Sequence, residues 1–104
     1  MVVRWFATDK GRCPARAFID SLEVKFQAAI LADLAAIELH GDDAPVSRKT
    51  IKGHRPMVEI RTGQYRTFYV MKGGDLWVLG ACKKQDQEQE IENCDRRMAI
   101  VLEG

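Results

Sequence analysis

Apolar residues recur along the chain with two different periods, and the change of period separates a helical half from a stranded half. Phe26, Ile30, Leu34 and Ile37 are spaced three or four residues apart, which predicts an amphipathic helix. Over residues 57–61 apolar and polar side chains alternate instead, which is typical of a β-strand that buries one face. The chain is therefore expected to combine helices with a sheet.

Turn-forming residues mark where the other elements begin and end. Residues 2–6 are β-branched and aromatic and predict a short strand, and Pro14 suits the first turn of a helix before the long one. In the second half, turns at 62–64 and 72–75 separate three strands, which span 57–61, 65–71 and 76–82. A last helix is indicated by a capping box, Asp86 with Gln89, and by an apolar seam of Ile91, Cys94, Met98 and Val101.

The order of these elements, βααβββα, predicts an α+β fold in a single domain over residues 1–104. We expect an antiparallel twisted sheet, with two N-terminal helices packed on one face and a C-terminal helix. No apolar run reaches the roughly 18 residues that a membrane span needs, and the polar residues after Phe6 argue against a signal peptide. The three cysteines lack a CxxC spacing. We therefore expect a soluble, cytoplasmic protein without disulfides, metal or membrane contact.

Basic residues are concentrated in the middle of the chain, although the formal net charge is only +1. Residues 48–84 hold nine lysines and arginines against two acidic residues, whereas the segments on either side are net acidic. Positive charge gathered on one surface attracts polyanions. Because the guanidinium fork matches phosphate oxygens, this segment is the candidate nucleic-acid interface.

Strand alternation predicts which of these side chains share a face of the sheet. With two-residue turns, Arg66 lies between Arg61 and Ala81, and Phe68 lies between Glu59 and Leu79; a three-residue first turn would change the pairing. One face then carries a cationic patch on an apolar floor, and the basic connector 46–56 flanks it with Lys49, Lys52 and Arg55. That face consists of Glu59, Arg61, Arg66, Phe68, Leu79 and Lys83. The opposite face, where we expect the two N-terminal helices to pack, consists of Val58, Ile60, Tyr69, Val78 and Cys82.

Several short motifs in the second half resemble, in order and spacing, those of the RelE/ParE superfamily of toxins from type II toxin–antitoxin systems. They are Lys52-Gly53, Met57-Val58-Glu59-Ile60-Arg61, Tyr65-Arg66-Thr67-Phe68-Tyr69, the apolar strand 76–82, and Lys83-Lys84 before a terminal helix. The likeness is greatest to the HigB-like, phage-derived branch and covers residues 51–92. It implies a small toxin that cleaves mRNA on the ribosome and so inhibits translation, without a metal or cofactor.

The resemblance also implies a role for individual residues in an attack of the 2′-hydroxyl on the adjacent phosphate. Arg66 matches the strand arginine that contacts the scissile phosphate. Lys83 and Lys84 match the basic pair that stabilises the transition state or donates a proton to the leaving oxygen. Further RNA-binding candidates are Lys49, Lys52, Arg55 and Arg61.

Two departures from the family pattern leave the general base open. Glu59 stands where some relatives carry a lysine, and residues 85–104 contain neither tyrosine nor histidine. His54, Glu59 or a lysine with a lowered pKa could take the proton. His54 could equally be a loop histidine, and Glu59 could serve to orient the arginines.

Two functions of different class fit these observations. Arg66 and Lys83-Lys84 favour the endonuclease, whereas the missing C-terminal tyrosine or histidine favours a ParE-like inhibitor of DNA gyrase with no nuclease activity. A third alternative is an inactive module that only binds its antitoxin or nucleic acid. The expected partners are mRNA on the ribosome and a cognate antitoxin, a helix-turn-helix protein encoded next door, with an acidic segment that binds the basic residues.

Overall fold

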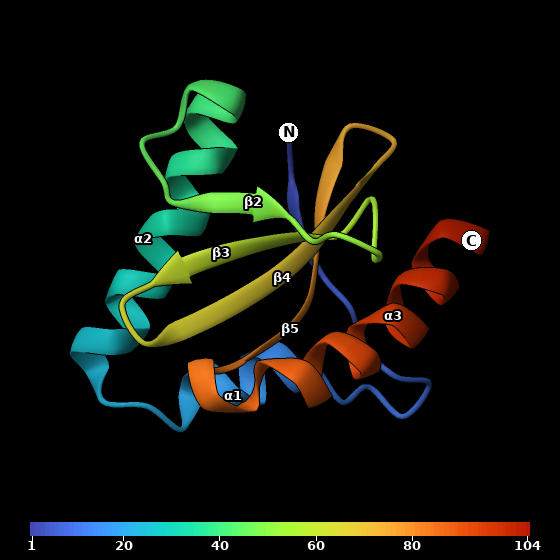
Figure 1. The fold of residues 1–104 in the computed structure, drawn as a ribbon, viewed down its shortest axis with the longest axis horizontal. Helices are drawn as coiled ribbons and strands as arrows, with labels where there is room; N and C mark the ends of the chain where they lie inside the picture. The colour runs from blue at the N-terminus through green and yellow to red at the C-terminus, as the bar shows by residue number, and fades with distance from the viewer.

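A five-stranded sheet runs through the middle of the molecule, between a layer of two helices and a single helix (Figure 1). The computed structural model describes all of residues 1–104. Its strands are β1 (Val3–Trp5), β2 (Arg48–Thr50), β3 (Val58–Thr62), β4 (Tyr65–Lys72) and β5 (Asp75–Lys83). Its helices are α1 (Pro14–Asp20), α2 (Val24–His40) and α3 (Gln87–Glu103), with short 3₁₀ turns η1 (Gly41–Asp43) and η2 (Lys84–Asp86). The predicted α+β class is confirmed.

The edges of the sheet differ from the prediction in two respects. β1 pairs with β5 in parallel, so the strand order β1-β5-β4-β3-β2 is antiparallel except at this edge. At the other edge, residues that the sequence placed in a connector form β2 and pair with β3. Arg4 Nε donates to Asp75 Oδ2 at 2.8 Å and the Val2 N–H donates to Oδ1, which ties β1 to the β4–β5 turn. These two bonds hold the pKa of Asp75 below its usual value.

Both hairpins turn through two residues, because Thr62 pairs with Tyr65 and Lys72 pairs with Asp75. Gly63 has a φ of +58°, which a residue with a side chain adopts only under strain. With this turn length, Arg61 lies opposite Arg66 and the register predicted between β3 and β4 is confirmed.

A β-bulge changes the register predicted between β4 and β5. Tyr69 pairs with Val78 but Phe68 pairs with Gly80, so Leu79 is an extra residue with no partner. Leu79 stays on the predicted face, but beyond it, over residues 80–83, each position faces the side opposite to the one predicted.

Four predictions that depended on the unbulged register are therefore wrong. Phe68 lies opposite Gly80 rather than Leu79, and Arg66 lies opposite Cys82 rather than Ala81. Cys82 belongs to the face of Arg66. Lys83 pairs with Tyr65 and so lies on the other face of the sheet.

Each face of the sheet has its own apolar core. Toward α1 and α2 the buried residues are Ala15, Ile19, Ile30, Leu34, Ile37, Ala44, Ile60, Tyr69, Leu76, Val78 and Ala81. Toward α3 they are Phe6, Met57, Phe68, Val70, Leu79, Cys82, Cys94, Met98 and Val101. None of the helices is sufficiently long and apolar to cross a membrane.

The apolar seam predicted for the last helix is confirmed, but its capping box is not. Cys94, Met98 and Val101 are buried against the sheet. Asp86 makes no side-chain hydrogen bond at the N-cap, and Gln89 donates to Asn93 instead. α3 is therefore held by packing against the sheet rather than by its first turn.

Candidate nucleic-acid interface

Charged residues from three strands lie in two neighbouring rows on the sheet face that α3 covers. One row pairs Lys49 with Glu59, and the next pairs Arg61 with Arg66. Residues two apart on a strand share a face, so both rows point to the same side. The prediction that Glu59, Arg61 and Arg66 share one face is confirmed.

The two arginines that face each other are turned apart by different acceptors. Arg61 Nε donates to Glu59 Oε2 at 2.9 Å, and the Arg61 side chain remains 45% exposed. Arg66 is only 7% exposed, and its Nη1 donates to the carbonyl oxygens of Gly63 and Tyr65 at 2.8 and 2.9 Å. Its Nε is buried without a partner. Arg61 is thus the accessible cation of the pair, and Arg66 also fastens the β3–β4 turn.

The basic connector brings a histidine against α3. Backbone hydrogen bonds between Ile51, His54 and Met57 close residues 51–57 into a tight loop. There His54 Nδ1 lies 2.6 Å from Asp95 Oδ2, and about a third of each side chain is exposed. A carboxylate that accepts the Nδ1 proton leaves Nε2 with its lone pair. Lys52 and Arg55, on either side of His54 in the chain, are exposed.

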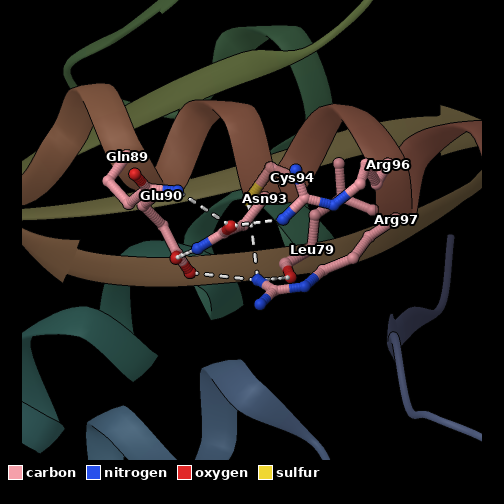
Figure 2. Close-up of polar contacts among 7 residues, drawn as sticks. All are labelled: Leu79, Gln89, Glu90, Asn93, Cys94, Arg96 and Arg97. Carbon is pink, nitrogen blue, oxygen red and sulfur yellow. Dashed lines mark hydrogen bonds and ion pairs between the residues drawn. The ribbon is translucent and has the colours of Figure 1, made fainter.

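The bulge in β5 also determines how closely α3 approaches the sheet. Leu79 has no residue opposite it on β4, and its carbonyl accepts a hydrogen bond from Arg97 Nη1 at 3.0 Å (Figure 2). The same nitrogen donates to Glu90 Oε2 at 3.0 Å. A Cβ on Gly80 would lie 2.7 Å from both Arg97 Nη1 and Cys94 Sγ. Only glycine allows this approach.

Two thiols lie in the contact between α3 and the sheet. Burial raises the pKa of Cys82 to about 12, and burial also raises the pKa of Cys94 well above its usual value. Because thiols react as thiolates, these cysteines are structural rather than nucleophilic.

The remaining predicted residues divide between the two sides of the sheet. Lys49 is exposed at the β2 edge, on the face of Glu59, and Lys84 is exposed in η2, directly before α3. Lys83 lies on the opposite side, where it lines a cavity of about 530 Å³. The other lining residues are Phe26, Ala29, Thr62, Gly63, Gln64, Tyr65 and Gln85.

Sequence reasoning missed Asp95 and the cavity residues Phe26, Gln64 and Gln85. Asp95 is one of six acidic residues in the last segment, and nothing local distinguishes it. The position of Lys83 in the cavity had one signal in the sequence. An isolated glycine inside a strand, here Gly80, often marks a bulge, and a bulge there places Lys83 beside Tyr65.

The same arrangement of elements is found in a solved structure. A structure of the RelB–RelE antitoxin–toxin complex from Methanococcus jannaschii contains a chain of the same fold, with a TM-score of 0.64 at 11% sequence identity. The match covers 86% of this chain and 96% of that chain. The RelE-like fold that the motifs implied is therefore confirmed.

The family follows from the sequence match rather than from the structural one. Residues 17–99 match the model of the phage-derived Gp49-like proteins (DUF891), and the chain belongs to that family. No curated protein matches the chain.

Proposed function

We propose that this protein is the toxin of a type II toxin–antitoxin system and a ribosome-dependent mRNA endonuclease that inhibits translation. The Gp49-like family and the RelE fold support the toxin assignment. The endonuclease assignment is carried by one observation, the contact of His54 with Asp95, in a loop where the exposed cations Lys52 and Arg55 flank His54 in the chain.

The His54–Asp95 pair has the properties of a general base with its positioning carboxylate. Asp95 accepts a hydrogen bond from the Nδ1–H of His54 and fixes the ring, so that Nε2 can take the proton of a 2′-hydroxyl. A bond then forms between the 2′-oxygen and phosphorus, and the bond from phosphorus to the 5′-oxygen breaks. The products are a 2′,3′-cyclic phosphate and a 5′-hydroxyl.

The cations near His54 supply the remaining requirements of this reaction. Lys52 and Arg55 are exposed beside it and can neutralise the charge that develops on the phosphate. Lys84 is the candidate for protonating the leaving 5′-oxygen. Lys83 is given no part in this step, because it lies on the other face of the sheet.

Glu59 and Arg66 are better suited to positioning than to direct chemistry. Glu59 is 2% exposed and its carboxylate holds Arg61, which itself remains accessible to phosphate. Arg66 is engaged by the β3–β4 turn. We assign phosphate binding to Arg61 and Lys49, on a surface whose shape Glu59 and Arg66 maintain.

The proposed antitoxin contributes an acidic segment to the same basic surface. The neighbouring structure is an antitoxin–toxin complex, which supports a protein partner for this chain as well. Lys49, Lys52, Arg55 and Arg61 are exposed around the β2–β3 edge and connector. An acidic peptide bound there would compete with RNA and would be released by salt.

The test measures cleavage of a reporter mRNA in a reconstituted translation system. His54→Ala is expected to slow cleavage by about 100-fold or more, and Asp95→Asn by a smaller factor, because a positioned base contributes about 10²–10⁴ in rate. His40→Ala is the matched control, because His40 is exposed at the end of α2 and should be without effect. The wild-type products should carry the two ends named above. A folded His54→Ala protein that cleaves at the wild-type rate would overturn the assignment of the base.

A ParE-like inhibitor of DNA gyrase is the second candidate. It is favoured by the burial of Arg66 and by the position of Lys83 on the far face, which leave fewer cations for a reacting phosphate. Inhibition of supercoiling by wild-type protein, with reporter mRNA left intact, would establish this function in place of the first.

A further inference from the structure

The cavity that Lys83 lines has two aromatic walls. Phe26 and Tyr65 have ring centroids 5.2 Å apart and planes tilted by 56°, and Phe18 supports Tyr65 edge-on at 6.1 Å. Tyr65 packs against the apolar core, whereas Phe26 belongs to neither core cluster. A preformed aromatic corner in a cavity of about 530 Å³ offers a stacking surface to a flat ligand.

The polar groups of this cavity define the rest of the ligand. Gln64 and Gln85 supply neutral amides that both donate and accept hydrogen bonds. Lys83 is the one charged lining residue, and none of the ion pairs of the chain involves it. A nucleotide matches each of these features. Its base can stack on the aromatic rings, the polar edge of the base can exchange hydrogen bonds with the amides, and its anionic phosphate can pair with Lys83.

The β3–β4 turn separates this cavity from the α3-side face and belongs to both. Gly63 and Tyr65 line the cavity, while their carbonyls accept hydrogen bonds from Arg66 on the other face. The Lys84 N–H donates to the Gln64 carbonyl at 2.7 Å, so η2 is fastened to the same turn. In Figure 1 the turn lies at the free end of the β3–β4 hairpin. An RNA strand that continues from the basic face around this turn would enter the cavity.

We infer that this cavity is a subsite for one base of single-stranded RNA, several nucleotides along the strand from the position cleaved beside His54, because β3 lies between the 51–57 loop and the turn that lines the cavity. The inference rests on the proposed RNA-cleaving function. It assigns Lys83 to a flanking phosphate rather than to the reacting one, and it makes Phe26 and Tyr65 the stacking platform.

The test uses a short single-stranded oligoribonucleotide that carries 2-aminopurine, whose fluorescence is quenched on stacking. Phe26→Leu keeps an apolar contact with Tyr65 but removes the ring, so quenching should disappear and binding weaken by about 5- to 100-fold. Lys83→Gln should lower the slope of log affinity against log salt by about 0.7. Lys10→Gln, an exposed lysine in the loop between β1 and α1, is the matched control and should behave as wild type.

The outcomes separate failure of the subsite from failure of the proposed function. If wild-type protein cleaves mRNA while Phe26→Leu and Lys83→Gln match Lys10→Gln in quenching, affinity and salt slope, the subsite is wrong and the proposed function stands. If wild-type protein neither binds nor cleaves RNA, both the subsite and the proposed function are wrong. If the variants weaken antitoxin binding alone, the cavity is a protein contact and the inference is wrong. Circular dichroism checks folding, and if Phe26→Leu unfolds, Lys83→Gln and Gln85→Ala, both exposed, decide the question.

Discussion

The two faces of the sheet are built from different kinds of residue. Toward α1 and α2 the buried side chains are aliphatic except for two uncharged polar residues. The Tyr69 hydroxyl accepts a hydrogen bond from Arg48, and the Thr67 hydroxyl is buried without a partner. Toward α3 the apolar cluster lies beside buried Glu59 and Arg66 and the half-buried pair of Glu90 with Arg97. The first face therefore has the composition of an ordinary hydrophobic core, without charged side chains.

We expect the second face to be the less stable of the two, because its buried polar groups, Glu59 and Arg66, are charged whereas those of the first face are not. A buried charge must be paired or hydrogen-bonded to offset its lost hydration, and Arg66 Nε has no partner at all. Such groups are concentrated where a surface has a function beyond packing. We therefore regard the α1–α2 face as the foundation of the fold and the α3 face as its adaptable side.

The largest effect should come from the α1–α2 face. Ile19 is fully buried there, and Ile19→Ala should lower the free energy of unfolding by about 2–5 kcal/mol through lost burial and a cavity. Leu39→Ala, at a side chain 77% exposed, should change it by less than about 0.5 kcal/mol. Urea denaturation measures both. If Ile19→Ala lowered the free energy of unfolding by less than Gly80→Ala, a substitution on the α3 face, the ranking of the two faces would be reversed.

A smaller effect is expected where α3 contacts β5. Gly80→Ala places a Cβ against Glu90, Arg97 and Cys94 of α3, which must shift to make room, so the protein should lose about 1–3 kcal/mol of stability. Faster alkylation of Cys94 should accompany the loss. Gly104→Ala is the control, because a Cβ there meets only ordinary contacts of 3.6–3.8 Å. Unchanged stability and thiol protection in Gly80→Ala would show that α3 is not held by this contact.

The smallest effect concerns the buried thiols and appears only at high pH. At pH 8 the half-exposed Cys13 should be alkylated first, while Cys82 and Cys94 stay protected. The pKa of Cys82 rises from 9.0 to about 12 on folding, so above pH 9 the unfolded chain releases a proton that the folded chain keeps. Stability should therefore fall between about pH 9 and 12, and less steeply in Cys82→Ala. Unfolding curves across this range would contradict the assignment if wild type and Cys82→Ala fell equally.

The structure confirms much of what local patterns predicted on the strand side. Gly63-Gln64 and Gly73-Gly74 form two-residue turns because Gly63, Gly73 and Gly74 adopt the positive φ angles that such turns need. The turn at 63–64 places Arg61 opposite Arg66. The alternation of residues 57–61 and the seam of α3 also indicate which side chains are buried. Each of these features depends on neighbours within a few residues along the chain.

Features that depend on residues distant in the sequence were not predictable in the same way. The bulge at Leu79 is stabilised by Arg97, 18 residues further on, and it moved Cys82 and Lys83 to faces other than those expected. The pairing of His54 with Asp95 joins positions 41 residues apart. In each case the local sequence allows several backbone arrangements of nearly equal free energy, and a contact with another element determines which of them forms.

The sequence by itself determined the order of the elements, the turns and the concentration of positive charge, because these follow from side-chain type and local spacing. Only the tertiary structure decided which cations share a face, which histidine meets a carboxylate and where a cavity opens. Those outcomes depend on how α2 and α3 pack against the sheet. A one-residue bulge in β5 is enough to turn Lys83 from the basic face into the cavity on the other side.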